Sequence, residues 1–146
     1  MPIVLVVDDE SPIRDLLVRW VSGDGYQMRE AATAEAALAD MQVTPADIVL
    51  CDVRMPGETG LWLTGQLRSR FPETAIVLVT SDTSVSPQIT LQPGVVEYLA
   101  KPFTREEVLK AVRVAARWHE TAVSERGHTK KVSHALTKEW IRASND

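Results

Sequence analysis

Three carboxylates directly follow apolar runs in this sequence, a placement suited to binding a cation. Asp8 and Asp9 come after the run 3–7, and Asp52 comes after the run 48–51. Short continuous apolar runs are typical of strands buried on both faces of a parallel sheet. Because ligands of such sheets bind beyond the carboxyl ends of the strands, we expect the three carboxylates to share one crevice.

A hydroxyl and an amine follow two later apolar runs in the same way. Thr80 ends the run 75–80, and Lys101 lies at the C-terminal end of the last expected strand, 95–99, which is apolar except for Glu97. Crowded carboxylates raise each other's pKa unless a cation offsets their charge, and Mg²⁺ is the cation that suits carboxylate, water and phosphate ligands. With Mg²⁺ bound, Asp52 is able to attack phosphorus while Lys101 and Thr80 contact the phosphoryl oxygens.

Alternating strands and helices are needed to bring these side chains together. We expect five strands, at 3–7, 27–31, 48–51, 75–80 and 95–99. Most of these strands are followed by segments in which apolar residues recur at helical spacing. Thr104 and Glu107 form a capping box at the start of the last helix. The pattern predicts an α/β fold, a doubly wound parallel five-stranded sheet with helices on both faces.

Composition excludes several classes of protein. The 146 residues suit one domain with an appendage, and the net charge of −4 argues against direct nucleic-acid binding, which requires a basic surface. No apolar segment is long enough to span a membrane, and the N-terminus lacks the pattern of a signal peptide. The single cysteine rules out an internal disulfide. A cytoplasmic protein with no membrane partner is expected.

The combination of these motifs resembles the receiver domain of two-component response regulators. The residues that carry the resemblance are Asp8-Asp9, Asp52 within DVRMPG, Thr80 and Lys101-Pro102. The resemblance implies a flavodoxin-like sheet of order 2-1-3-4-5. We assign residues 1–121 to this domain and residues 122–146 to a C-terminal helical extension or linker, for which a connection to an effector domain is one of the alternatives given below.

The resemblance also implies partners and a metal. A sensor histidine kinase or a phosphotransfer protein would phosphorylate Asp52, and a downstream effector protein or domain would respond. Mg²⁺ would be held by Asp9, Asp52 and the main-chain carbonyl of Arg54, with Asp8 assisting through water. Such a domain catalyses only its own phosphorylation and dephosphorylation, so it is a regulator rather than an enzyme with a diffusible substrate.

The remaining implied roles concern the response to phosphorylation. Lys101 would bind the phosphoryl group, Thr80 would move toward it, and Tyr98 would change rotamer. The Lys101-Pro102 peptide is expected to be cis. We further predict that Arg54 and Asp82 pair across the mouth of the site and slow hydrolysis, which the autodephosphorylation rate of a double alanine variant would test.

Two segments depart from the family pattern. Prolines interrupt the segment 82–94, leaving room for barely two helical turns where the family has a continuous fourth helix, which puts the usual mode of homodimerisation in question. Beyond residue 121, Gly127 is predicted to interrupt the helix, with a second helix at 130–144. That helix would dock on its own receiver, pair with another chain, or lead into an effector domain.

Two other functions remain open from the residues. A phosphohydrolase resembling the haloacid dehalogenase group also uses an aspartate nucleophile and Mg²⁺, but requires a second aspartate where this chain has Arg54. A phosphorylation-independent binding module would lack one of the key side chains, and none is missing. Phosphorylation by acetyl phosphate separates these alternatives.

Overall fold

Helices and strands alternate along the chain. The structure is a computed structural model that describes residues 1–81 and 94–144, with side chains as far as residue 126. Its elements are β1 (Ile3–Val7), α1 (Ser11–Ser22), β2 (Gln27–Ala31), α2 (Ala34–Val43), β3 (Ile48–Asp52), α3 (Gly60–Arg70), β4 (Ala75–Thr80), β5 (Val95–Ala100) and α5 (Arg105–Ser144). All five predicted strands are present, including 27–31, which has no continuous apolar run, and their ends differ from the predicted ones by at most one residue.

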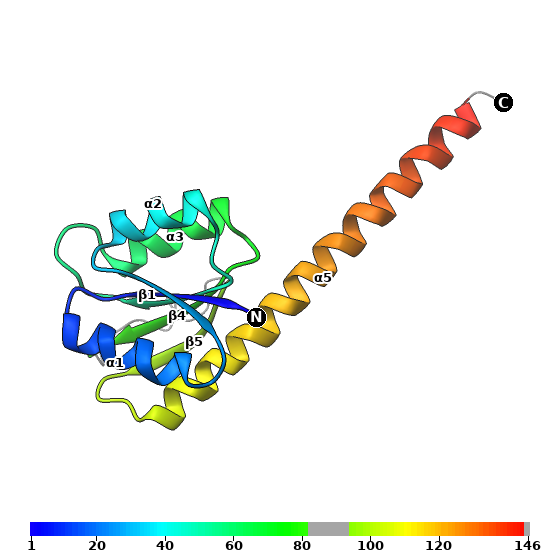
Figure 1. Cartoon of the computed structure of the whole chain (residues 1–146). Helices are drawn as coiled ribbons and strands as arrows, with labels where there is room; N and C mark the ends of the chain where they lie inside the picture. The colour runs from blue at the N-terminus through cyan, green and yellow to red at the C-terminus, as the bar shows by residue number, and fades with distance from the viewer. Residues whose placement is uncertain (82–93, 145–146) are drawn as a thin grey trace.

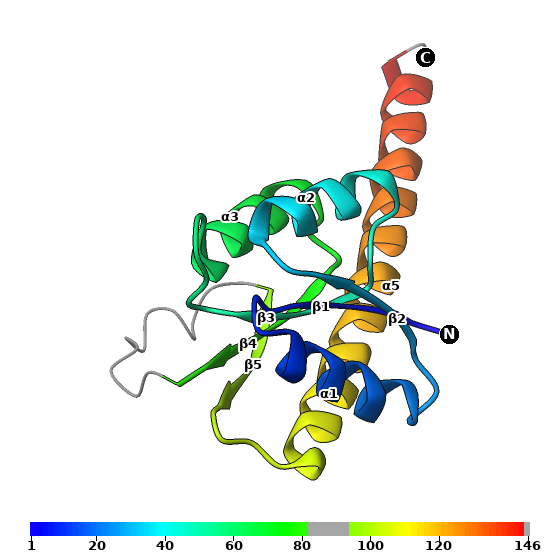
Figure 2. The same ribbon diagram turned by 60° about the vertical axis from the view of Figure 1, so that its left-hand side comes forward.

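The five strands form one parallel sheet of order β2-β1-β3-β4-β5. Helices α2 and α3 cover one face, and α1 and α5 cover the other (Figures 1 and 2). This arrangement confirms the predicted α/β class and the strand order that the resemblance implied. All five strands point the same way, so their carboxyl ends meet at one edge of the sheet.

The core has two halves because successive strand residues point to opposite faces. Leu5 and Val7 of β1 pack under α2 and α3, whereas Val4 and Val6 pack under α1 and α5. Every residue of β3 and β4 is buried. Such strands cannot shift in register without exposing apolar side chains, so the residues at their carboxyl ends are held in place.

Threonines at the helix starts satisfy N–H groups that lack a partner within the helix. The hydroxyls of Thr33 and Thr59 accept hydrogen bonds from the first turns of α2 and α3. In the predicted capping box, the N–H of Glu107 donates to the Thr104 hydroxyl at 3.2 Å, and the N–H of Thr104 donates to the Glu107 carboxylate at 3.4 Å. The capping box is therefore confirmed at the start of α5.

Helix α5 is continuous for 40 residues, and the predicted interruption at Gly127 is wrong. A glycine inside a helix costs only about 1 kcal/mol relative to alanine, too little to stop a helix whose neighbouring residues favour it. The C-terminal part of the helix runs outward from the domain (Figure 1), so the segment 130–144 does not dock on its own receiver, which was one of the three expectations.

Contacts near the amino ends of the strands hold α5 where it leaves the domain. The His119 ring lies with Nδ1 at 2.6 Å from the Glu73 carbonyl oxygen and Nε2 at 3.1 Å from Asp47 Oδ1. Two turns later, Arg126 Nη1 lies 3.0 Å from Glu73 Oε1. These contacts set the direction in which α5 departs.

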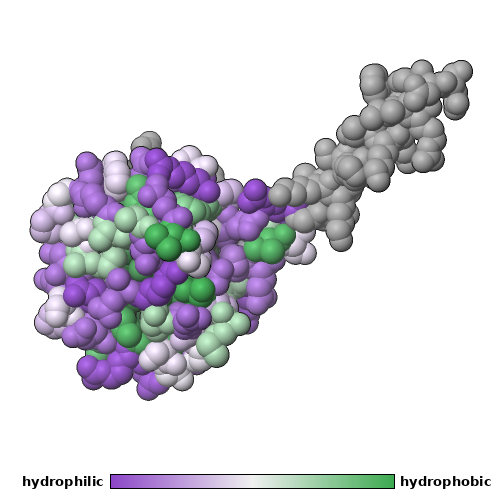
Figure 3. Space-filling model, turned by 45° about the horizontal axis from the view of Figure 1, so that its top comes forward, coloured by the Kyte–Doolittle hydropathy of each residue, from purple (hydrophilic) through white to green (hydrophobic). Residues whose placement is uncertain are grey.

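Where side chains are described, residues 1–81 and 94–126, few large apolar ones are exposed. Among the described residues, the exposed ones are Met1, Val43 and Val123. On the face shown in Figure 3, apolar residues are interspersed with hydrophilic ones. No helix in the described part of the chain is both long enough and apolar enough to cross a bilayer. The prediction for segment 82–94 concerns residues that, apart from Gly94, lie outside the described part.

Candidate functional site

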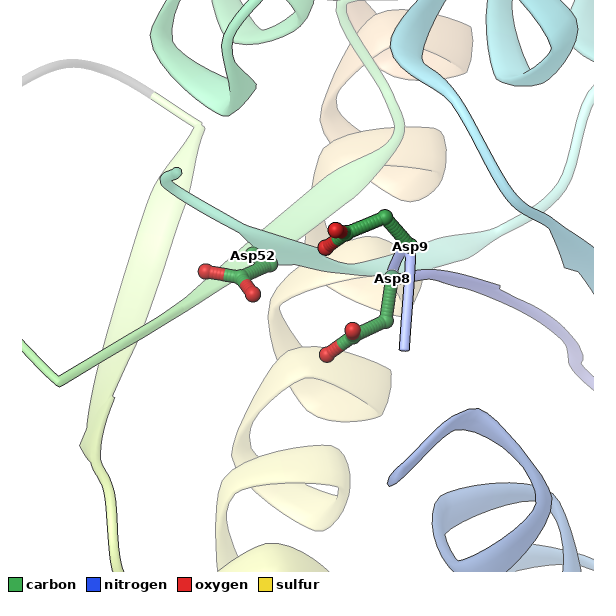
Figure 4. A group of neighbouring side chains, drawn as sticks. All are labelled: Asp8, Asp9 and Asp52. Atoms are coloured by element: carbon green, nitrogen blue, oxygen red, sulfur yellow. The ribbon is translucent and has the colours of Figure 1, made fainter. Parts of the chain in front are cut away.

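Three carboxylates gather at the carboxyl edge of the sheet, where β1 and β3 end. One carboxylate oxygen from each of Asp8, Asp9 and Asp52 lies within 4.8 Å of the other two. Figure 4 shows the side chains of Asp8 and Asp9 extending beside Asp52. Asp8 and Asp52 are buried, whereas Asp9 is exposed. The convergence expected from the strand ends is therefore present.

Lys101 brings an ammonium group into the same cluster from the end of β5. Its Nζ donates to Asp52 Oδ2 at 3.0 Å and lies 3.5 Å from Asp8 Oδ2 and 3.7 Å from Glu10 Oε2. The main-chain N–H of Lys101 donates to the Thr80 carbonyl at 2.7 Å, which ties the residue to the end of β4. The peptide between Lys101 and Pro102 is cis, as predicted.

Burial and charge act against each other in this cluster. Burial raises the pKa of Asp8, although a hydrogen bond from the Glu10 N–H and the charge of Lys101 oppose the rise. Burial by itself would lower the pKa of Lys101, but the hydrogen bond to Asp52 and the charges of the surrounding acids together raise it. Lys101 is therefore protonated at neutral pH.

The residues present fit a divalent cation. The donors are carboxylate oxygens, which Mg²⁺ prefers, and they converge at the rim of the site. Three carboxylates against one ammonium leave a formal charge of −2, which one divalent cation neutralises. The exposed carboxylate of Asp9 leaves the cluster open to solvent on one side.

The other predicted residues lie around this cluster. Thr80 is buried at the end of β4, and Tyr98 in β5 packs against the core half under α2 and α3. The N–H of Arg54 donates to Asp52 Oδ1 at 3.1 Å, so Arg54 adjoins the reactive carboxylate. Asp82 lies outside the described residues, so its pairing with Arg54 remains a prediction.

The comparison with protein families decides the identity. A model of the response regulator receiver domain matches residues 4–113, well over half of the chain. The chain belongs to this family. Among curated relatives, the sensory transduction protein RegX3 of Mycobacterium tuberculosis H37Rv is 31% identical over 117 residues, 80% of this chain and 52% of the relative. The chain thus spans about half the length of the curated relatives it matches.

Solved receiver structures agree with the fold. The chemotaxis protein CheY4 of Vibrio cholerae has a TM-score of 0.70 and 33% identity, covering 77% of this chain and 97% of that one. TrrA of Thermotoga maritima, solved in complex with Mg(2+)-BeF, has a TM-score of 0.72 and 32% identity, covering 79% of this chain and 99% of that one. A receiver domain from Methanospirillum hungatei, 24% identical and with a TM-score of 0.76, covers 83% of this chain and 98% of its own and supports the fold alone.

Sequence reasoning missed one residue that holds the loop after Asp52. Glu35, in the first turn of α2, accepts a hydrogen bond from the Glu58 N–H at 3.1 Å, beside Gly57 in its left-handed conformation. Hydrogen bonds from its own N–H and from that of Glu58 lower the pKa of Glu35. An acid in the first turn of a helix is common, so its position carried no signal of this contact.

Gly60 is a second residue whose role became visible only in the receiver fold. A Cβ at Gly60 would overlap the main-chain carbonyl of Asp52, whereas a Cβ at Gly65, on the same helix, would meet nothing within 4 Å. The absence of a side chain at Gly60 therefore allows α3 to start directly beside the reactive strand end. Position 60 requires glycine for space rather than for an unusual backbone angle.

These two glycines form a matched pair for a stability test. We expect Gly60→Ala to lower the free energy of unfolding by about 1–3 kcal/mol, because backbone atoms must shift to relieve the overlap. Gly65→Ala should raise it by about 0.5–1 kcal/mol, since alanine favours the helix and has room. Urea unfolding followed by circular dichroism measures both. Equal effects at the two positions would show that the contact with Asp52 does not constrain the fold.

Proposed function

We propose that this receiver domain is a phosphorylation-controlled switch that accepts a phosphoryl group on Asp52 from a sensor histidine kinase or a phosphotransfer protein. The observation that carries the proposal is the single cluster formed by Asp52, two further carboxylates and the Lys101 ammonium, 3.0 Å from Asp52. This is the charge arrangement that transfer to a carboxylate requires, because phosphoryl transfer depends mainly on positioning and electrostatics.

Mg²⁺ would be held by Asp9, Asp52 and the main-chain carbonyl of Arg54, with Asp8 assisting through water. When bound, the ion offsets negative charge on the nucleophile and on the phosphoryl oxygens. The carboxylate donor set supports this assignment, as does the Mg(2+)-BeF complex of the similar protein TrrA. Without a cation, the excess negative charge of the cluster would repel an approaching phosphate.

The side chains of this chain would perform the remaining steps. A carboxylate oxygen of Asp52 attacks phosphorus, a P–O bond forms, and the bond to the leaving group breaks with its electron pair. Lys101, already beside Asp52, would then pair with a phosphoryl oxygen. The Thr80 hydroxyl would donate to another phosphoryl oxygen, and Tyr98 would reorient in response.

The output would be a change in the surface offered to a downstream effector protein or domain. A homodimer is a further assembly to test, by sedimentation with and without phosphorylation. The phosphohydrolase alternative is disfavoured because Arg54 stands where that group needs a second aspartate.

Incubation with acetyl phosphate and Mg²⁺, followed by intact mass measurement, tests the proposal. A receiver gains one phosphoryl group, and omission of Mg²⁺ or addition of EDTA prevents the gain. Turnover of free phosphate esters without a lasting gain in mass would instead indicate a phosphohydrolase. No gain and no turnover would indicate a phosphorylation-independent binding module and overturn the proposal.

A further inference from the structure

Arg14, in α1, holds the main chain of the loop that carries the acidic pair. Its Nη1 donates to the main-chain carbonyl of Asp8 at 2.7 Å, and its Nε donates to Glu30 Oε1 at 2.9 Å. The Arg14 side chain is only 17% exposed, so the guanidinium is well shielded from water. The guanidinium thus links the β1–α1 loop to the carboxyl end of β2.

The carbonyl that Arg14 binds belongs to the peptide between Asp8 and Asp9. A peptide is planar, so fixing the direction of this carbonyl also fixes the plane from which Asp9 departs. The other main-chain group of Asp8 is held as well, since its N–H donates to the Ala31 carbonyl at 3.2 Å. The carboxylate of Asp8 in turn accepts from the Glu10 N–H at 2.8 Å.

Asp9 depends more on this backbone restraint than its two partners in the cluster do. Asp8 and Asp52 are buried and hydrogen-bonded, whereas Asp9 is exposed. Within residues 1–81 and 94–126, no donor holds the Asp9 carboxylate. The direction of its main chain is therefore the main restraint on where that carboxylate lies.

We propose that Arg14 is a positioning residue that orients the Asp8–Asp9 peptide and so presents Asp9 to the Mg²⁺ of the acidic site, with Glu30 fixing the guanidinium. The inference rests on the proposed function, since it assigns Mg²⁺ to this cluster. Glu30 is 46% exposed, and an exposed ion pair contributes little to stability, so the pair acts chiefly by orienting the planar fork of Arg14.

Mg²⁺ binding measured by calorimetry tests this role without any phosphoryl transfer. We expect Arg14→Met and Arg14→Lys each to raise the Kd for Mg²⁺ by about 10-fold or more, the usual effect of removing a group that orients metal ligands. Lysine keeps the charge but cannot bind both oxygens with a planar fork. Arg19→Met, an exposed arginine of the same helix, is the matched control and should leave the Kd unchanged.

The phosphorylation rate as a function of Mg²⁺ concentration provides a second readout. The variants should need more Mg²⁺ yet approach the wild-type rate at saturation, because Asp52 and Lys101 remain in place. A rate that stays low at saturating Mg²⁺ would assign Arg14 a merely structural role. Circular dichroism verifies that the variants fold. If Arg14→Met does not fold, Glu30→Gln, which leaves Arg14 itself intact, replaces it in the test and should raise the Kd for Mg²⁺ two- to threefold.

Two results of the Mg²⁺ binding measurement would also overturn the inference. Wild-type affinity in Arg14→Met would show that the contact does not position Asp9, and wild-type affinity in Arg14→Lys alone would show that charge rather than the fork matters. Failure of the proposed function looks different, because the wild-type protein itself would then bind no Mg²⁺ and gain no phosphoryl group.

Discussion

Asp52→Asn is expected to abolish phosphoryl incorporation from acetyl phosphate, under conditions in which the wild-type protein gains one phosphoryl group. The amide has nearly the shape of the carboxylate, and its oxygen still accepts a hydrogen bond of the kind that the Arg54 N–H donates at 3.1 Å. It lacks the charge and the nucleophilic oxygen that attack phosphorus. Intact mass after incubation with Mg²⁺ measures the effect.

Asp47→Asn is the matched control, because Asp47 precedes the same strand at its opposite end. Its Oδ2 accepts a hydrogen bond from the Ile3 N–H at 2.8 Å, which an amide oxygen is able to accept. This variant should gain one phosphoryl group as the wild type does. A gain that persists in Asp52→Asn, mapped by peptide mass to Asp8 or Asp9, would refute Asp52 as the acceptor.

Lys101→Met is expected to lower the free energy of unfolding by about 1–3 kcal/mol at neutral pH without Mg²⁺, because two largely buried carboxylates lose their cation. Lys101 Nζ lies 3.0 Å from Asp52 and 3.5 Å from Asp8, and the side chains of these aspartates are 8% and 2% exposed. Adding Mg²⁺ should restore part of the loss by supplying another cation. Urea unfolding with and without Mg²⁺ measures both effects.

The loss of unfolding free energy in Lys101→Met should also become smaller as the pH falls. Burial raises the pKa of Asp8 above its ordinary value of 3.8, so the folded state holds that proton more tightly than the unfolded state does. The resulting stabilisation is complete below pH 3.8 and disappears as the pH rises through the folded-state pKa. Without Lys101 this pKa rises further. The difference in the free energy of unfolding between Lys101→Met and the wild type is therefore largest at pH values above the folded-state pKa of Asp8.

Lys110→Met removes an exposed lysine of α5 and is the control. It should change the free energy of unfolding by no more than about 0.5 kcal/mol at any pH. A Lys101→Met variant that matches this control, or a loss that does not vary between acidic and neutral pH, would show that the ammonium does not stabilise the acidic cluster.

The positions of the main site residues were predictable from local sequence. Asp52 and Thr80 end apolar runs, and Asp8 directly follows one. A short apolar run becomes a strand buried on both faces, and parallel strands bring their carboxyl ends to one edge. That geometry places the acids and Lys101 along the same edge of the sheet. The strand order, in contrast, came from the resemblance to the receiver family.

Only the tertiary structure decided which polar side chains support the site. Arg14 reaches Glu30 and the Asp8 carbonyl, and Glu35 reaches Glu58, 23 residues away. Both side chains belong to helices and contact residues of loops or strands, so each contact depends on how the helix is placed over the sheet. Residue type alone leaves such side chains indistinguishable from ordinary solvated charges.

Some features of helix α5 are likewise determined by local sequence and others by tertiary packing. Its start was determined locally, because the capping box of Thr104 and Glu107 lies within one turn. It continues through Gly127 because the helix propensity of the adjoining residues outweighs the small cost of one glycine. Considering Gly127 alone overestimated that cost. Its direction depends on His119 meeting Asp47 and Glu73, from two separate loops. Local sequence thus determined the strands and the reactive groups at their ends, whereas the packing of distant segments determined what orients those groups.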